Sequence, residues 1–265
     1  MHNGAKTVCR PEDRQSTRQC NGPGAAGSGI MQTILVINSK GGCGKSTISA
    51  NLASYFASCG ARTALIDYDP QGSTMHWLSA RPGHLPYIHG IHASKPRSGL
   101  TRVWQMTVPP DTERVVMDAP AGVCGPKLQE MINRTDTIVV PVTPSAIDIH
   151  ATSAFVRDLL LVGKIRRVGI RVGVIANRVR RNAPQYEPLK KFLSSLGIPF
   201  VTSLADSDKY ILAAEQGMGI HEMDKEDTLF EREQWSPLIR WLSVPEQGVV
   251  QEETRPRLNL VSMTR

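Results

Sequence analysis

A ten-residue stretch, Asn38 to Thr47, constrains this chain more than any other feature. It reads Asn-Ser-Lys-Gly-Gly-Cys-Gly-Lys-Ser-Thr, and it lies between an apolar run at residues 33–37 and an apolar-periodic segment that continues to Phe56. A strand, a glycine-rich loop and a helix, in that order, are the setting in which such a loop binds phosphate. Glycines let successive N–H groups turn inward towards phosphate oxygens, and the start of the helix adds its positive dipole end.

The residues of this loop have distinct expected roles. Lys45 is expected to reach the β- and γ-phosphates of a nucleotide, and the Ser46 hydroxyl is expected to bind Mg²⁺. The residues predicted to hold the nucleotide phosphates are Gly41, Gly42, Cys43, Gly44, Lys45, Ser46 and Thr47. The general pattern has glycine where this chain has Ser39, and an additional lysine, Lys40, stands at the entrance of the loop.

Length and composition limit the classes of protein. The chain has 265 residues, enough for one large α/β domain or two small ones. The net charge of +7 favours polyanionic partners. The five cysteines include no Cys-x-x-Cys pair, which favours a reduced, intracellular protein over a disulfide scaffold. No apolar run approaches the roughly 18 residues of a membrane span, and no secretory signal is recognisable.

One folded domain is predicted, over residues 31–244. Residues 1–30 are polar and are expected to be disordered, with Met31 as an alternative start, and residues 245–265 are expected to be a flexible tail. Strands are predicted at 33–37, 62–67, 87–91, 114–118, 137–142, 169–176 and 200–203. After the helix that follows the loop, further helices are predicted at 73–78, 100–105, 149–161, 188–196, 208–216 and 229–242. This alternation predicts an α/β fold, a mostly parallel twisted sheet flanked by helices on both faces.

Carboxylates follow two of the predicted strands. Asp67 and Asp69 open the sequence Asp-Tyr-Asp-Pro-Gln-Gly, and Asp118 ends the strand at 114–118. Ligands of open α/β sheets bind at the carboxyl ends of strands, and a strand-end aspartate suits a Mg²⁺-linked carboxylate. The alternative for the first pair is an ordinary capped turn before a helix, and many buried strands end in aspartate without binding a metal.

These motifs together resemble the ParA/MinD family of P-loop ATPases. The loop from Lys40 to Thr47 resembles the deviant Walker A motif of that family, and residues 67–72 are similar to the acidic element of its ParA branch. Residues 118–120 resemble its Walker B and switch II region, and residues 141–152 also follow the ParA pattern. The resemblance extends from about residue 31 to residue 222.

The resemblance implies a homodimer that forms on ATP and encloses two ATP molecules. In such a dimer Lys40 would cross to the nucleotide of the partner and act with Lys45 in catalysis. A cation at that place suits the charge that develops in phosphoryl transfer. Asp69 would hold the attacking water.

The resemblance also implies a magnesium site and a base-binding residue. Ser46 would bind Mg²⁺ directly, Asp118 would act through a water, and Asp67 would support the metal shell or the switch. Asn177 matches the asparagine with which the family reads adenine, and its alternative is a turn residue at a strand end.

A basic run from residue 164 to residue 191 holds nine lysines and arginines against a single acid, Glu187. Such density favours binding to the phosphates of double-stranded DNA without sequence preference. No aromatic residues are interleaved usefully for stacking on single strands, and no recognition-helix motif is present. The predicted DNA contacts are Arg166, Arg167, Arg178, Arg180, Arg181, Lys190 and Lys191. The alternative is a solvated charged face.

The function expected from the resemblance is that of a ParA-type ATPase in the cytoplasm, associated with the nucleoid. It would position a plasmid, a chromosome region or a large protein assembly, and a ParB-like or cargo adaptor would stimulate hydrolysis. A MinD-like membrane ATPase is a second reading, but the tail containing Pro256 makes a poor membrane anchor. A metallocluster carrier would need paired cysteines, whereas Cys124 has no neighbouring cysteine in sequence. A small-molecule ligase or kinase would need a substrate pocket.

Overall fold

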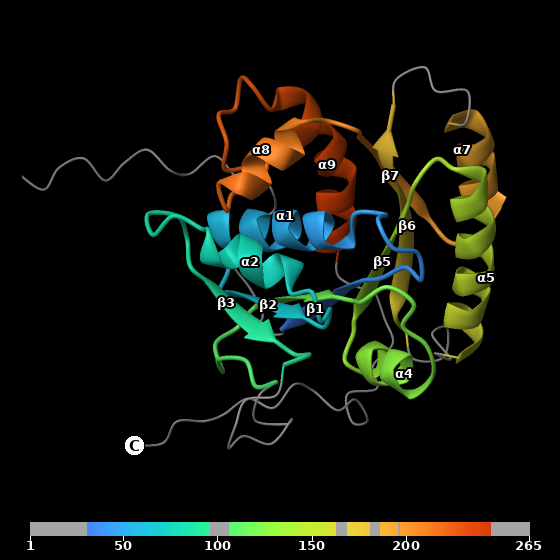
Figure 1. Ribbon diagram of the computed structural model, residues 1–265, viewed down its shortest axis with the longest axis horizontal. Coiled ribbons are helices and arrows are strands. Elements are labelled where there is room, and N and C mark those ends of the chain that lie inside the picture. The colour runs from blue at the N-terminus through green and yellow to red at the C-terminus, as the bar shows by residue number, and fades with distance from the viewer. Residues whose placement is uncertain (1–30, 96–105, 163–168, 181–185, 196, 245–265) are drawn as a thin grey trace, which may run out of the picture.

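The computed structural model describes residues 31–95, 106–162, 169–180, 186–195 and 197–244, which form one sheet with helices on both faces (Figure 1). The predicted helix at 100–105, the predicted leader at 1–30 and the predicted tail at 245–265 lie outside these residues. The strands are β1 (Gln32–Val36), β2 (Thr63–Asp67), β3 (Ile88–His92), β4 (Arg114–Asp118), β5 (Thr137–Val142), β6 (Arg171–Val179) and β7 (Phe200–Ala205). The helices are α1 (Lys45–Ser58), α2 (Ser73–Ser79), α4 (Gly125–Asn133), α5 (Ala146–Val162), α7 (Tyr186–Ser195), α8 (Lys209–Glu215) and α9 (Leu229–Ser243).

The described strands form a seven-stranded sheet in the order β3-β2-β4-β1-β5-β6-β7. Every neighbouring pair is parallel, so the expectation of a mostly parallel sheet is confirmed. The seven predicted strands are found with their ends shifted by up to three residues. Parallel sheets need helical crossovers, and the intervening helices provide them.

One described helix, α4, was not predicted. It begins at Gly125 with Pro126 next to it, two residues that usually mark a turn. Its buried side chains are Leu128, Met131 and Ile132. Their spacing of three and four residues forms an apolar stripe that is too short to stand out in sequence, and burial against the sheet stabilises it.

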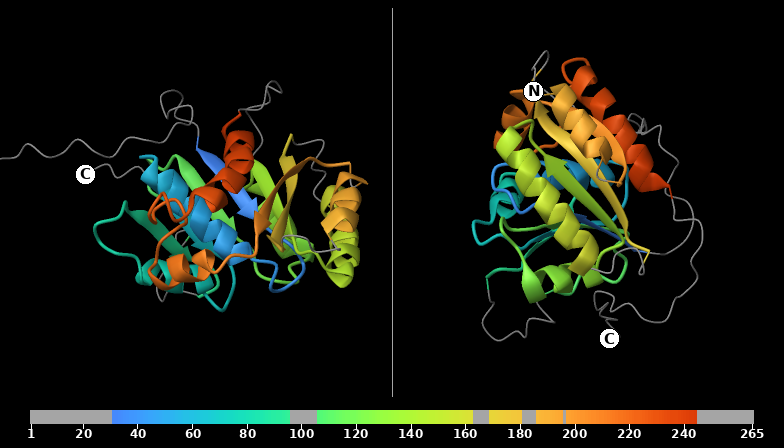
Figure 2. Two further views of the ribbon diagram at one scale, coloured as in Figure 1. Left: turned by 90° about the horizontal axis from the view of Figure 1, so that it is seen from above. Right: turned by 90° about the vertical axis from the view of Figure 1, so that its right-hand side faces the viewer.

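Apolar side chains are buried on both faces of the sheet. One cluster includes Trp77 of α2 and Trp235 of α9, together with residues of α1. The other includes Leu128 of α4, Leu159 of α5 and Leu193 of α7. Figure 2 shows these two groups of helices on opposite sides of the strands. Because both faces are covered, β2 and β5 are buried along their whole length, as parallel strands usually are.

The carboxyl ends of the central strands lie together. β1 lies between β4 and β5, and Val36 at its end is in register with Asp118 of β4. Asp118 is in turn in register with Asp67 of β2. The glycine-rich loop that follows β1 and the two aspartates therefore occupy the same edge of the sheet, where ligands of such folds bind.

A buried ion pair holds α2 to a segment near the chain's end. Arg81 follows α2, and its Nη2 lies 2.5 Å from Oε1 of Glu222. These side chains are only 5% and 2% exposed. The indole nitrogen of Trp77 donates a hydrogen bond to the main-chain oxygen of Met218 at 3.1 Å. Helix α2 is therefore fastened to residues 217–222 at two points.

Within the described ranges, every helix is too short or too polar to span a membrane.

Candidate functional site

The glycine-rich loop joins β1 to α1 and is fixed at its entrance by Asn38. The Asn38 side chain donates to the main-chain oxygen of Pro141 at 2.7 Å and accepts from the Lys40 amide at 3.1 Å. Gly42 and Gly44 have φ angles of 76° and 89°, in the left-handed region that glycine adopts at low cost. Gly44 then caps α1, whose first turn contains no acidic side chain. The loop and the helix start together can therefore present N–H groups to an anion.

Lys45 lies at the start of α1 and is 7% exposed. Its ammonium donates a hydrogen bond to the main-chain oxygen of Lys40 at 3.0 Å, across the mouth of the loop. This contact holds the positive charge over the loop, where the sequence predicts the phosphates. The Lys40 side chain is partly exposed, and its role towards a second subunit stays a prediction.

Asp118 is buried beside the first turn of α1. Its Oδ1 accepts a hydrogen bond from Ser49 at 3.2 Å, whereas its buried Oδ2 has no hydrogen-bond partner among the described residues. Burial raises the pKa of Asp118 to about 7, and the charge of Asp67 adds to this increase. The hydroxyls of Ser46 and Ser49 and the charge of Lys45 oppose it. A buried carboxylate oxygen without a partner is unfavourable unless a cation or water meets it.

The oxygen donors here suit Mg²⁺. Among the described residues, no cluster of three or more His, Cys, Asp or Glu side chains could form an all-protein metal site. Mg²⁺ commonly binds one or two protein oxygens and takes its remaining ligands from phosphates and water. The Ser46 hydroxyl and the free oxygen of Asp118 fit that requirement. The loop after Asp118 is also joined to the glycine loop, because the Gly122 amide donates to the Ser39 oxygen at 2.9 Å.

Asp67 has hydrogen-bond partners on both carboxylate oxygens. Its Oδ1 accepts from the Asp69 amide at 2.9 Å. Its Oδ2 accepts from the amide and the hydroxyl of Thr74 at 3.0 and 2.6 Å. These bonds shape the acidic loop and the start of α2, as the capped-turn alternative requires. A role for Asp67 in the metal shell stays a prediction.

Asp69 is partly buried in the same loop. Its Oδ1 accepts from the Gln71 amide at 2.9 Å, and its main-chain oxygen accepts from Ser94 at 3.3 Å. These bonds give the loop a defined shape. The role of Asp69 in holding the attacking water stays a prediction.

Asn177 contacts the glycine loop directly. Its side-chain nitrogen donates to the main-chain oxygen of Cys43 at 2.8 Å, and the residue is 7% exposed. A Cβ atom on Gly44 would lie 2.2 Å from the same nitrogen, so glycine is required there by contact as well as by φ. Reading of adenine by Asn177 stays a prediction, but the residue is in reach of a suitable pocket.

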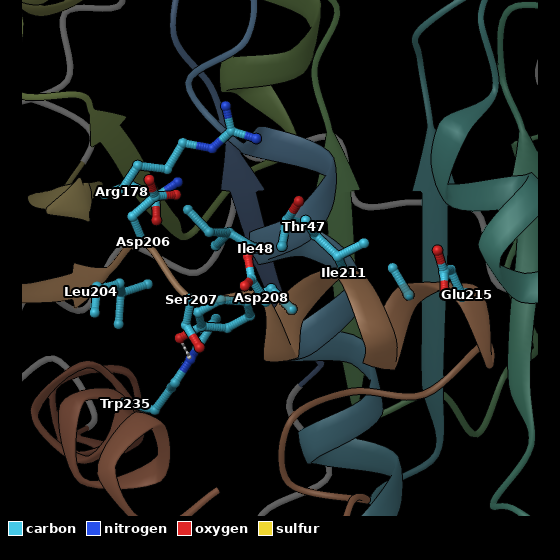
Figure 3. A pocket seen from close by; sticks show the side chains of 14 residues that line it. Thr47, Ile48, Arg178, Leu204, Asp206, Ser207, Asp208, Ile211, Glu215 and Trp235 are labelled. Atoms are coloured by element: carbon cyan, nitrogen blue, oxygen red, sulfur yellow. Dashed lines mark hydrogen bonds between the residues drawn. The ribbon is translucent and has the colours of Figure 1, made fainter. Parts of the chain in front are cut away.

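That pocket has a volume of about 270 Å³ and begins beside Thr47 and Ile48 of α1 (Figure 3). Its other walls come from the ends of β6 and β7, from α8 and from α9; they include Asn177, Arg178, Leu204, Asp206, Tyr210, Ile211 and Trp235. The Trp235 indole donates to the Tyr210 hydroxyl at 2.9 Å, which fixes the floor. The size and the partly apolar lining suit a nucleobase.

Sequence reasoning missed the wall from β7 and α8. The signal was available in part, because the predicted strand at 200–203 has its carboxyl end at the same edge of the sheet. A second pocket, of about 320 Å³, lies against Gly41 and Gly42 and extends to residues 143–145, Arg178, Arg180 and Asp206.

The predicted DNA-contact residues are only partly described. Arg166, Arg167 and Arg181 lie outside the described residues. Lys190 and Lys191 are exposed on α7, and Arg178 and Arg180 are exposed at the end of β6. Arg180 forms an ion pair with Asp206, with Nε 3.2 Å from Oδ2.

Arg171 belongs to the basic run but contacts the protein. Its guanidinium lies 4.5 Å from the centre of the Trp241 ring and donates to the main-chain oxygen of Val244 at 2.6 Å. The high charge of the run is therefore not all available to an outside partner.

The parallel sheet and the glycine loop at its carboxyl edge define a nucleotide-binding protein of the P-loop class. The chain belongs to the family described as the CobQ/CobB/MinD/ParA nucleotide binding domain, whose model matches residues 34–220. That match contains the glycine loop, the aspartates of β2 and β4, and Asn177.

Characterised relatives include partition and positioning proteins. The chain is 25% identical over 196 residues to Maintenance of carboxysome distribution protein A from Halothiobacillus neapolitanus, a match to 72% of this chain and 87% of that protein. It is 41% identical over 56 residues to the chromosome-partitioning ATPase Soj of Treponema pallidum, but this match spans 21% of this chain and 22% of Soj.

Solved structures share the fold at low sequence identity. An ATP complex of a Cyanothece McdA variant superimposes with a TM-score of 0.58 and 16% identity, over 78% of this chain and 96% of that chain. The MinD cell division protein of Aquifex aeolicus gives a TM-score of 0.56 and 17% identity, over 81% of this chain and 98% of that chain.

Proposed function

We propose that this protein is a ParA-type ATPase that binds Mg²⁺ and ATP, pairs with a second copy and holds a cargo on DNA until a partner stimulates hydrolysis. The observation that carries the proposal is the meeting of Lys45 and Asp118 at one edge of the sheet. A nearly buried ammonium faces the glycine loop, and a buried carboxylate oxygen without a partner among the described residues lies beside the same helix start.

The residues divide the chemistry between them. The loop amides and Lys45 would bind the phosphates. Ser46 would bind Mg²⁺ directly and Asp118 through a water, and Asp67 would support the metal shell. The metal, when bound, neutralises charge on the phosphate oxygens. Asp69 orients the attacking water. The preference for ATP rests on the pocket beside Asn177.

Lys40 supplies the reason to propose a homodimer. It stands at the loop entrance, and its main-chain oxygen already accepts a hydrogen bond from Lys45. A lysine whose backbone faces its own loop is suited to extend its side chain to another nucleotide. We expect the protein to be a monomer without nucleotide and a dimer with a non-hydrolysable ATP analogue, and Lys40→Ala to stay monomeric, as measured by light scattering.

Exposed cations on α7 and at the end of β6 support DNA binding without sequence preference. Arg178, Arg180, Lys190 and Lys191 are the described candidates. Contacts to phosphates of this kind weaken steeply with salt. The protein would accordingly be cytoplasmic and associated with the nucleoid.

The cargo is proposed from the relatives. The relative from Halothiobacillus, matched over most of its length, is named for carboxysome distribution, and shorter matches are named for chromosome partitioning. The longer match favours a large protein assembly as the cargo, attached through an adaptor, over a chromosome or plasmid attached through a ParB-like protein.

The central experiment measures affinity for a random-sequence duplex by fluorescence anisotropy, with ATP and Mg²⁺, with ADP, and without nucleotide. Tight DNA binding is expected only in the presence of ATP and Mg²⁺. Lys40→Ala should abolish the difference in DNA affinity between the three nucleotide conditions. Arg180→Glu should weaken binding and reduce the salt slope by about 1 or more. Arg240→Glu, an exposed reversal outside the basic run, is the matched control. Equal DNA affinity in all three nucleotide states would refute the proposal.

A further inference from the structure

The end of β6 is distorted at the point where it meets the site. Arg178 has a φ angle of 55°, and it is the one non-glycine residue in the described ranges with a positive φ. The pairing of β6 with β7 shifts between Ala176 and Val179, so Asn177 and Arg178 lie in an irregularity of the ladder. Bulges of this kind redirect side chains, and strained backbone is concentrated at functional sites.

The distortion directs two neighbouring residues to the nucleotide site. Asn177 donates to the Cys43 oxygen at 2.8 Å, which fastens the strand end to the phosphate loop. Arg178 lines both pockets, the one beside Thr47 and the one against Gly42. In Figure 3 the Arg178 side chain extends away from Leu204 and Trp235, and its guanidinium lies at the opposite end of the view from the pocket floor.

The guanidinium of Arg178 is available to bind an anion, because the nearby acidic side chain already pairs with another arginine. The nearby carboxylate of Asp206 is paired with Arg180 at 3.2 Å. In the part of the chain that the structure describes, the Arg178 side chain makes no hydrogen bond or ion pair, and it is exposed. Because its backbone adopts the left-handed conformation, Arg178 lies between the pocket beside Thr47 and the glycine loop. Its positive charge has no acidic partner among the described residues.

We propose that Arg178 is a nucleotide-binding residue, and that its guanidinium binds the phosphate chain of ATP or ADP in its own subunit. A planar guanidinium with five donors suits bidentate contact with phosphate oxygens. The inference rests on the proposed nucleotide site and removes Arg178 from the predicted DNA contacts. Lys190, Lys191 and Arg180 keep that role.

The test compares Arg178→Gly, Arg178→Lys and the control Arg240→Ala with the wild-type chain. Glycine accepts a φ of 55°, so Arg178→Gly is expected to fold and to melt at the same or a higher temperature. Its Kd for ATP and for ADP should rise about 10-fold to 100-fold by calorimetry. The Kd values of Arg178→Lys should lie between those of wild type and Arg178→Gly, because lysine keeps the positive charge but lacks the planar guanidinium that makes bidentate contacts. Arg240→Ala, at an exposed position on α9 away from both pockets, should bind both nucleotides within about twofold of wild type.

Adenosine and DNA separate this role from the others. Adenosine lacks phosphates, so its affinity should be the same for Arg178→Gly and wild type; a loss of adenosine affinity equal to the loss for ATP would show contact with the base and overturn the phosphate contact. Unchanged ATP affinity together with a DNA salt slope reduced by about 1 would return Arg178 to the DNA interface. If the wild-type chain bound no ATP, the proposed function would fail as well, whereas wild-type binding with an unaffected Arg178→Gly would overturn this inference alone.

Discussion

The side-chain nitrogen of Asn177 lies 2.8 Å from the main-chain oxygen of Cys43, so the end of β6 is hydrogen-bonded to the phosphate loop. This bond connects residues 134 positions apart in the sequence. It makes the shape of the loop depend on the part of the sheet that also walls the proposed base pocket.

Asn177→Ala should weaken both the fold and nucleotide binding. The variant leaves the Cys43 oxygen without its donor, and the free energy of unfolding is expected to fall by about 1–3 kcal/mol. Asn177→Asp preserves shape but cannot donate, so it should be at least as damaging. Urea unfolding and calorimetry with ATP measure the two effects. Wild-type stability in both variants would mean that the bond contributes nothing in solution.

Gly44→Ala tests the close approach of Asn177. A methyl group there meets the Asn177 nitrogen at 2.2 Å and also imposes a φ of 89° on alanine. The expected loss is about 2–4 kcal/mol, from strain and the displaced hydrogen bond together. Gly60→Ala is a matched control, because Gly60 has a φ of 87° with nothing within 4 Å, and it should cost only the strain of about 1–2 kcal/mol. Equal losses in a urea titration would show that contact with Asn177 is unimportant.

Asp118→Asn should stabilise the metal-free fold and remove Mg²⁺-dependent hydrolysis. The pKa of Asp118 rises from 3.8 to about 7 on folding. Between these values the folded protein binds a proton that the unfolded chain has lost, so this group lowers stability as pH rises. The penalty is complete above pH 7 and is at most on the order of 4 kcal/mol. Unfolding in EDTA at pH 5 and pH 8 should show the gain of the variant growing with pH. A gain that does not grow would contradict the burial effect.

His221 should make the fold sensitive to mild acid. Burial, assisted by the charge of Arg232, lowers the pKa of His221 to about 4. The centroid of its ring lies 4.8 Å from that of Tyr55 and 6.1 Å from that of Trp235. Between pH 4 and 6.5 the unfolded chain binds the proton that the folded chain excludes, so stability falls as pH falls. At pH 5 the loss is about 2 kcal/mol.

His221→Phe should remove this acid sensitivity, because phenylalanine fits the aromatic cluster without titrating. His84→Phe, at an exposed position, is the control. Asp118 changes stability in the opposite direction over the same range. The measurement is therefore the difference between each variant and wild type at pH 5 and pH 7, and an unchanged difference would exclude His221 as the cause.

The positions of the glycine loop and of the strand-end aspartates could be predicted because each motif consists of residues that are adjacent in the sequence. Lys45 lies at the start of α1 and Asp118 at the end of β4, as the sequence predicts, while their roles towards phosphate and Mg²⁺ stay predictions. The order of strands and helices follows from apolar runs. The strand pairing then brings Asp67 beside Asp118, an adjacency that the parallel fold imposes.

Other parts of the site depend on geometry that no local pattern contains. The pocket wall from Leu204 to Ile211 belongs to a short strand and helix without a motif. The irregularity at the end of β6, which supports the proposed nucleotide role of Arg178, has no local sequence signal, so a count of charges places Arg178 among the predicted DNA contacts. The hydrogen bonds of Asp67 to Thr74 are local, seven residues along the chain, and they agree with the capped-turn alternative, whereas the role of Asp67 at the metal stays a prediction.

The ion pair between Arg81 and Glu222 limits how the acidic loop can move. Because α2 is fastened to residues 217–222 by this buried pair and by Trp77, it is not expected to shift as a rigid rod when ATP replaces ADP. Any displacement of Asp69 would then be absorbed within the five residues between β2 and α2 (68–72), by rotation about their own backbone bonds. The ion pair is therefore expected to confine movement near the nucleotide site to the loop at residues 68–72, with α2 as a fixed support.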